Sequence, residues 1–365
     1  MKILFLSVLL SYGGASKLIY DLLPRIEALG HQCDLLLLTG EHSKYIEDLR
    51  KKGISVSIVP KEIRSHFGKI KYIKNWIQDG NYDVIHANLF PMIYYCSIVK
   101  RMIGRKCAPI VMTEHNTDNR RRHLRVLKPI ERYIYLNYDH VISISEKTQE
   151  NLLNWVGINS STKFSVVVNG IDVEYFKNAQ PLEKKKLYQC YKDGDILLLN
   201  VGRFSLQKNH EKLIKALSQL PLNYILLLIG EGELQDKIKK QVHDLNLDER
   251  VVFLGFRKDV ASIMHTADVL VIPSVWEGFG LIAAEGMACG IPIAASDVPG
   301  LSDVLGEAAV KFNPMDYHDI AKKIEQLSRK DNFKMKELAL ERVKHFNLSQ
   351  MINSYINIYR FVRNE

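Results

Sequence analysis

Short runs of apolar residues recur along the chain. Within each run the apolar residues are nearly continuous rather than alternating, which is typical of strands buried on both faces of a parallel sheet. The first series covers residues 3–8, 35–38, 56–59, 84–86, 110–113, 141–144 and 164–168. The stretches between these runs are long enough for crossover helices, so the series predicts a doubly wound α/β sheet.

The same rhythm restarts in the second half of the chain, at residues 196–201, 224–229, 251–254, 269–272 and 291–294. Residues 178–195, between the two series, are polar, charged and rich in turn formers. We therefore expect an α/β protein with two Rossmann-like, doubly wound parallel-sheet lobes that face a central cleft. The expected boundaries are 1–177 for the first lobe, 178–195 for the interdomain connection and 196–345 for the second lobe.

Residues 346–365 are predicted to form a helical tail. Their apolar positions are Met351, Ile352, Tyr355, Ile356, Ile358, Tyr359 and Val362. A helix with such a face needs a surface that covers it. We expect this helix to pack back on the first lobe.

Composition narrows the class of protein. The 365 residues are 47% hydrophobic and 25% charged, as in ordinary globular domains, and the net charge of +9 indicates an anionic partner. The five cysteines are scattered without a C-x-x-C pair, which favours reduced thiols in the cytoplasm over a disulfide framework or a zinc site. The apolar N-terminus stops at Ser11 without a signal-peptide cleavage pattern, and no apolar stretch is long enough for a membrane-spanning helix.

Candidate binding and catalytic residues are concentrated after the apolar run at 269–272. Pro273 ends that run, Gly280 leaves the backbone open to a ligand, and a helix is predicted from Leu281. The N-terminus of a helix is a ready anion site. Glu277 lies in the loop before this helix and Glu285 about one turn inside it, so two carboxylates bracket a phosphate-sized position.

Two cations follow the first run of the second series. Arg203 and Lys208 come shortly after residues 196–201, at the predicted carboxyl edge of the sheet. Arginine offers a planar fork and lysine a point charge, and both suit a diphosphate. We expect them to stabilise the charge that develops on a departing nucleoside diphosphate.

The segment from Glu277 to Glu285 resembles the E-x7-E motif of glycosyltransferase family 4, the retaining enzymes with the two-lobed GT-B fold. Other segments resemble that family in the expected order over nearly the whole chain: Gly13 and Gly14 of the glycine loop, His115 at the end of a strand, the turn at 169–172, Gly202 to Asn209, Gly230 to Gly232, and Leu254 to Phe256. Each match is weak alone, but the ordered set is specific.

The resemblance implies a role for each of these residues. Arg203 and Lys208 hold the donor pyrophosphate, and Gly13 and Gly14 let the backbone approach it. Glu285 holds the ribose, and Glu277 and His115 position the donor sugar. The nucleotide base contacts the main chain near Phe256, and Gly280 and Leu281 form the helix N-terminus beside the phosphates.

The implied reaction is a retaining transfer without a metal or another cofactor. A hexose or N-acetylhexosamine moves from a nucleotide diphosphate, with UDP the expected nucleotide, to a hydroxyl of a glycan or polyprenyl-diphosphate-linked acceptor, in surface polysaccharide biosynthesis. Two rivals remain: another two-lobed sugar-nucleotide enzyme, such as an epimerase or a phosphorylase, and a non-catalytic two-lobed binding protein.

Three smaller features leave alternatives open. Asp193-Gly194-Asp195 matches the D-x-D metal motif of single-domain transferases, but it precedes a strand, where aspartate and glycine favour a turn. His86, at another strand end, is either a core residue or an acceptor contact. A basic stretch of the first lobe indicates a peripheral membrane surface, a site for an acceptor diphosphate or a solvated helix face, whereas no nucleic-acid reading motif accompanies it. Its cations are Arg101, Arg105, Lys106, Arg120, Arg121, Arg122, Arg125, Lys128 and Arg132.

Overall fold

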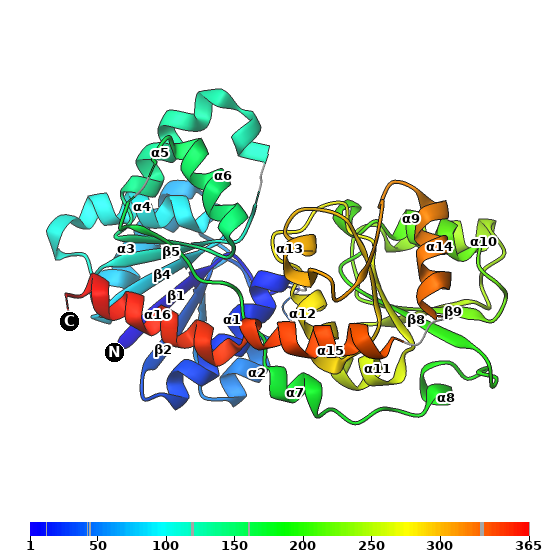
Figure 1. Cartoon of the computed structure of the whole chain (residues 1–365). Helices are drawn as coiled ribbons and strands as arrows, with labels where there is room; N and C mark the ends of the chain where they lie inside the picture. The colour runs from blue at the N-terminus through cyan, green and yellow to red at the C-terminus, as the bar shows by residue number, and fades with distance from the viewer. Residues whose placement is uncertain are drawn as a thin grey trace. The chain divides into compact units, whose positions relative to one another are not determined.

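The computed structural model describes residues 1–11, 13–41, 43, 45–117, 120–159, 161–328 and 332–364 (Figure 1). Contacts divide the chain into two compact units. The first unit contains Met1–Asn169 and the chain from Leu348 onward, and the second contains Gly170–Asn347. Among the helices of these residues, none combines the length and apolar character that crossing a bilayer requires.

The first unit is built on a parallel sheet with the strand order β3-β2-β1-β4-β5-β6-β7. Its strands are β1 (Lys2–Ser7), β2 (Gln32–Leu37), β3 (Ser55–Ile58), β4 (Val84–Asn88), β5 (Ile110–Glu114), β6 (His140–Ser143) and β7 (Phe164–Val166). Every residue of β4, β5 and β6 is buried, as the continuous apolar runs predict for a sheet covered on both faces.

Helices cover both faces of the first sheet, with α1, α2 and α16 on one side and α3 to α6 on the other (Figure 1). They are α1 (Gly14–Ala28), α2 (Ile46–Lys51), α3 (His66–Gly80), α4 (Met92–Ile103), α5 (Lys128–Leu136), α6 (Glu146–Val156) and α16 (Leu348–Val362), with 3-10 turns η1 (Gly104–Lys106), η2 (Arg120–His123) and η3 (Arg125–Leu127). Ser65 and Ser145 cap α3 and α6 by accepting hydrogen bonds from the amides of Gly68 and Thr148.

The second unit repeats this plan with the strand order β10-β9-β8-β11-β12-β13. Its strands are β8 (Ile196–Val201), β9 (Tyr224–Ile229), β10 (Val251–Gly255), β11 (Val269–Ile272), β12 (Ile293–Ser296) and β13 (Val310–Phe312). Its helices are α7 (Val173–Lys177), α8 (Lys184–Leu187), α9 (His210–Leu217), α10 (Gln235–Asp244), α11 (Val260–Thr266), α12 (Leu281–Cys289), α13 (Leu301–Leu305), α14 (Tyr317–Ser328) and α15 (Phe333–Arg342), with 3-10 turns η4 (Leu206–Lys208) and η5 (Val343–Phe346). The expectation of two doubly wound parallel-sheet lobes is confirmed, although β13 was missed.

The units divide earlier in the sequence than residue 177. The amide of Ile171 donates to the carbonyl of Phe346 at 2.8 Å, and α7 packs on α12, so residues 170–177 belong to the second unit. The predicted connection at 178–195 also belongs there. Lys184 pairs with Asp268 at 2.8 Å, and the hydroxyl of Tyr188 donates to the carbonyl of Glu249 at 3.0 Å. Polarity alone does not separate a linker from a segment pinned by polar contacts.

The helix α16 packs on the first unit through a buried polar cluster. The Nδ1 atom of His86 lies 2.6 Å from the hydroxyl of Tyr359, and its Nε2 atom lies 2.8 Å from Oγ1 of Thr113. The same threonine oxygen lies 3.2 Å from the hydroxyl of Tyr355. The last helix therefore belongs to the first unit.

Buried histidines make the stability of the fold depend on pH. Burial lowers the pKa of His86 and of His210 to about 3, and that of His140 to about 4. An unfolded chain titrates its histidines near ~6.5, so below that pH the unfolded state binds more protons than the folded state. Each lowered pKa therefore contributes a loss of stability as the pH falls from about 6.5 toward the folded pKa.

The variant His210→Phe tests whether the buried histidine makes the protein less stable as the pH falls. The ring of His210 stacks on Phe204 with centroids 4.3 Å apart, and neither ring nitrogen has a hydrogen-bond partner among the described residues, so phenylalanine can keep the stacking without the proton site. Urea unfolding at about pH 7 and about pH 4.5 should show that the variant loses less stability on acidification, by roughly 1–3 kcal/mol. Equal losses in the two proteins would contradict the neutral, buried state of His210.

Candidate active site

The carboxyl edge of the second sheet gathers most of the predicted site residues. All its strand pairs are parallel, and β8 lies between β9 and β11, which makes a switch point of the kind where α/β sheets bind ligands. Arg203 follows β8, Phe256 follows β10 and Glu277 follows β11. Because parallel strands end on the same side, these three residues share one edge of the sheet.

The structure brings Lys208 and Glu277 into direct contact. The Nζ atom of Lys208 lies 2.6 Å from Oε1 of Glu277, and Nε2 of Gln207 lies 3.4 Å from Oε2. The side chain of Glu277 is only 8% exposed, so its charge requires this compensation. Main-chain contacts join the same loops, since the amide of Val275 donates to the carbonyl of Gln207 at 2.8 Å. The pair therefore has a fixed position after β8 and β11.

Arg203 is paired with a different acid. Its Nε and Nη2 atoms each lie 3.0 Å from Oε2 of Glu233, and both side chains are 54% exposed. An added Cβ on Gly230 would lie 2.1 Å from the carbonyl oxygen of Gly202, and one on Gly232 would lie 2.5 Å from that of Phe204. These glycines let the loops after β9 and β8 touch, which positions the backbone of Arg203. Sequence reasoning missed Glu233 as a partner of Arg203.

The helix α12 begins beside the Lys208–Glu277 pair. Gly280 is its N-cap, and the helix starts at Leu281. Glu285 lies inside this helix and is 8% exposed. A Cβ on Gly300 would lie 2.4 Å from the carbonyl oxygen of Glu277, so the loop before α13 supports the glutamate loop by close backbone contact. A helix N-terminus and two buried carboxylates therefore occur in this segment.

The other predicted residues lie in the first unit, after β1 and β5. Gly13 is the N-cap of α1 and Gly14 is its first residue. A Cβ on Gly13 would have no atom of the described residues within 4 Å, and its φ of −102° is open to any residue. Neither local packing nor backbone conformation therefore requires glycine at this position.

His115 follows β5 directly and is half-buried. Its Nε2 atom lies 2.9 Å from Oδ1 of Asn88, the last residue of β4. Burial lowers the pKa of His115 to about 4, so the imidazole is neutral near pH 7. Sequence reasoning missed Asn88, although it ends a strand next to β5 in the sheet.

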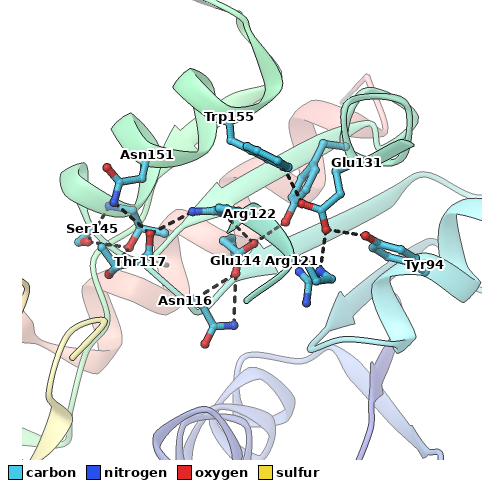
Figure 2. A network of polar contacts seen from close by, with 12 residues as sticks. Tyr94, Glu114, Asn116, Thr117, Arg121, Arg122, Glu131, Ser145, Asn151 and Trp155 are labelled. Atoms are coloured by element: carbon cyan, nitrogen blue, oxygen red, sulfur yellow. Dashed lines mark hydrogen bonds and ion pairs between the residues drawn. The ribbon is translucent and has the colours of Figure 1, made fainter. Parts of the chain in front are cut away.

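Two buried glutamates anchor the chain that follows His115 (Figure 2). Glu114 accepts hydrogen bonds from the hydroxyl of Tyr135 at 2.5 Å and the amide of Asn116 at 3.0 Å, and Arg122 pairs with it at 3.3 Å. Glu131 is fully buried and accepts from Tyr94, Arg121 and Trp155 at 2.5, 2.6 and 2.7 Å. Arg121 and Arg122 therefore compensate internal acids, and the basic stretch presents fewer cations to a partner than the sequence indicates.

Contacts elsewhere in the structure bear on two alternatives that the sequence leaves open. His86 is 1% exposed and both its ring nitrogens are bonded inside the first unit, so it is a core histidine and not an acceptor contact. Asp195 accepts a hydrogen bond from the amide of Lys192 at 2.8 Å, which makes Asp193-Gly194-Asp195 part of a turn. Within the described ranges, no cluster of three or more histidine, cysteine, aspartate or glutamate side chains could hold a metal ion.

Comparisons with known proteins identify related families and folds. Residues 12–175 match the family described as Glycosyltransferase Family 4, and residues 184–341 match the one described as Glycosyl transferases group 1. An uncharacterized glycosyltransferase of Methanocaldococcus jannaschii is 28% identical over 98% of this chain and 98% of its own.

Two further relatives widen the comparison. The N-acetylgalactosamine-N,N'-diacetylbacillosaminyl-diphospho-undecaprenol 4-alpha-N-acetylgalactosaminyltransferase of Campylobacter jejuni is 28% identical over 79% of this chain and 78% of its own. The fold is similar to that of Anabaena HepE in complex with UDP-glucose, with a TM-score of 0.84, 22% identity and coverage of 98% and 99% of the two chains. The ordered motifs, the two parallel sheets and the two adjoining family matches together place this chain among the family 4 glycosyltransferases of the GT-B fold.

Proposed function

We propose that this glycosyltransferase moves a hexose or N-acetylhexosamine from a UDP-sugar to a hydroxyl of a lipid-linked glycan, with retention of anomeric configuration and without a metal ion. The observation that carries the proposal is the Lys208–Glu277 contact of 2.6 Å beside the N-terminus of α12. The name of the Campylobacter relative, which acts on a diphospho-undecaprenol glycan, supports the acceptor class, and the UDP-glucose complex of HepE supports the nucleotide.

The Lys208–Glu277 pair has the hydrogen-bonding capacity for a sugar phosphate. A lysine ammonium has three N–H donors, so Lys208 can bond Glu277 and still donate to a phosphate oxygen. A carboxylate has about four acceptor positions, so Glu277 can accept from Lys208 and also from sugar hydroxyls. Lys208 also offsets the repulsion between Glu277 and the donor phosphates. We infer that the pair positions the sugar next to its leaving group.

Stabilisation of the negative charge on the departing UDP is assigned to Lys208, Arg203 and the first turn of α12. Positioned cations and helix amides stabilise such charge without the need for a metal. Glu285 is assigned to the ribose, and the backbone near Phe256 to the base. Gly13, Gly14 and His115 of the first unit keep the roles that the family resemblance implies, and the open space at Gly13 supports a close approach of the donor there.

Substitution of Glu277 tests the proposal directly. Glu277→Ala should lower the rate of UDP release from the preferred UDP-sugar by about 100-fold, because Lys208 loses its partner and the sugar loses an acceptor of hydrogen bonds. Glu233→Ala is the matched control, since Glu233 also pairs with a proposed pyrophosphate cation but is half exposed. It should change the rate by less than about threefold. Unchanged UDP release by Glu277→Ala would remove Glu277 from the site.

Chelation tests the absence of a metal requirement. Dialysis against EDTA should leave kcat unchanged, because protein cations neutralise the diphosphate in this proposal. The product is identified by mass spectrometry of the acceptor, which also separates transfer from epimerisation. Loss of activity that Mn²⁺ restores would contradict the proposal and return attention to Asp193 and Asp195.

An exposed surface on α5 and the turns before it suits an anionic membrane. Its large apolar side chains are Leu124, Val126, Ile130 and Tyr133, exposed by 56, 75, 51 and 53%. Arg125 and Lys128 are exposed beside them, and the guanidinium of Arg101 lies 5.9 Å from the centre of the Tyr133 ring. Each cation near an anionic surface contributes about 1 kcal/mol, and the apolar side chains can enter the interface. We propose that this surface brings the enzyme to membranes that hold its acceptor.

Vesicle binding tests the membrane contact. At low salt the protein should cosediment with vesicles containing anionic lipid and much less with neutral vesicles, and the double variant Val126→Ser/Ile130→Ser should reduce binding by about tenfold. Leu222→Ser serves as the control, because Leu222 is 83% exposed in the second unit. Equal binding to both kinds of vesicle would contradict the proposed surface.

A further inference from the structure

The side chain of His115 is held by a partner with a fixed orientation. Asn88 is 3% exposed, and its Oδ1 atom lies 2.9 Å from Nε2 of His115. Its Nδ2 atom donates to the carbonyl oxygen of His86 at 3.4 Å. If the amide were reversed, two oxygens that only accept would face each other at that distance. The backbone carbonyl of His86 therefore determines that Asn88 presents its oxygen to His115.

The orientation of Asn88 sets the donor and acceptor atoms of His115. A neutral imidazole has one N–H donor and one acceptor nitrogen. Because Oδ1 of Asn88 only accepts, Nε2 of His115 must carry the hydrogen. The Nδ1 atom then keeps its lone pair, and the structure gives Nδ1 no hydrogen-bond partner within the described part of the chain.

The surroundings keep this arrangement in place. Glu114, the residue before His115, is buried and bonded to Tyr135, Arg122 and Asn116 (Figure 2). Leu89, the residue after Asn88, has a φ of +64°, a backbone conformation that residues other than glycine rarely adopt. Such conformations are kept where the surrounding structure holds them, and they occur often at functional sites.

We propose that Asn88 is a positioning residue that fixes His115 as the Nε2–H tautomer, so that His115 offers Nδ1 to the substrate as a hydrogen-bond acceptor. The substrate group that it binds is then a hydrogen-bond donor, which we assign to a hydroxyl of the sugar, and not a phosphate oxygen, a ring oxygen or a glycosidic oxygen. This inference rests on the proposed contact between His115 and the donor sugar, and it adds the polarity of that contact.

The tautomer is measured by ¹⁵N NMR of histidine-labelled protein at about pH 8, with His115 assigned by comparison with His115→Gln. The wild-type enzyme should show the Nε2–H pattern. Asn88→Leu removes the amide and should give a mixture of tautomers, whereas Asn88→Asp keeps an acceptor oxygen and should retain Nε2–H. An Nδ1–H tautomer in the wild type, or an unchanged spectrum in Asn88→Leu, would overturn the proposal. If Asn88→Leu does not fold, the wild-type tautomer decides.

Kinetics test the substrate part of the inference. Among UDP-sugars that each lack one hydroxyl, one should have a kcat/KM about tenfold below that of its parent sugar with the wild type. With Asn88→Leu, the same analogue should react nearly as well as its parent sugar. If the tautomer is as proposed but every deoxy donor reacts like its parent, the hydroxyl contact is wrong. Failure of the proposed function is distinct from both results, because the wild type would then release no UDP from any sugar tested.

Discussion

Parallel pairing is the constraint on which the arrangement of this molecule depends. Each strand must be followed by a crossover, so every strand of a sheet ends on the same edge. In the second unit, this constraint brings Arg203, Phe256 and Glu277 to one edge although they are far apart in the sequence. In the first unit it places Asn88 beside His115. Most candidate site residues therefore lie on loops, while the hydrophobic strands determine where those loops begin.

Charge compensation is the second theme of the structure. Lys208 and Glu277 pair at low exposure, and Arg203 and Glu233 pair in solvent. Breaking these two pairs has different effects. A half-exposed pair is easily rearranged, whereas a buried carboxylate that loses its cation destabilises the protein. In the proposed function, the site thus keeps Lys208 in place and lets Arg203 change partners when the donor diphosphate binds. Glu114 and Glu131 are compensated in the same way within the first unit, where they pair with Arg122 and Arg121.

The fold could be predicted from the sequence because buried parallel strands leave continuous apolar runs. The prediction missed β13, which spans only Val310–Phe312 and carries a lysine at its centre. The candidate residues were found through motifs, since local glycines and acids mark a strand end followed by a helix. Their partners were not found. Glu233 and Asn88 have no local signature, and His86 is assigned to the core only when Tyr359, 273 residues later, closes over it. Charge counts failed for a similar reason, because the sequence does not reveal which arginines face a buried acid.

The placement of α16 has a consequence for biosynthesis. This helix belongs to the first unit but follows the whole of the second unit in the sequence. A ribosome must therefore translate Gly170–Asn347 before the sheet of the first unit receives Tyr355 and Tyr359. Until then, His86 and Thr113 lack their tyrosine partners and one face of the sheet is incompletely covered. The second unit can collapse during translation while the first still awaits its final helix, so the order of synthesis and the order of completion are reversed.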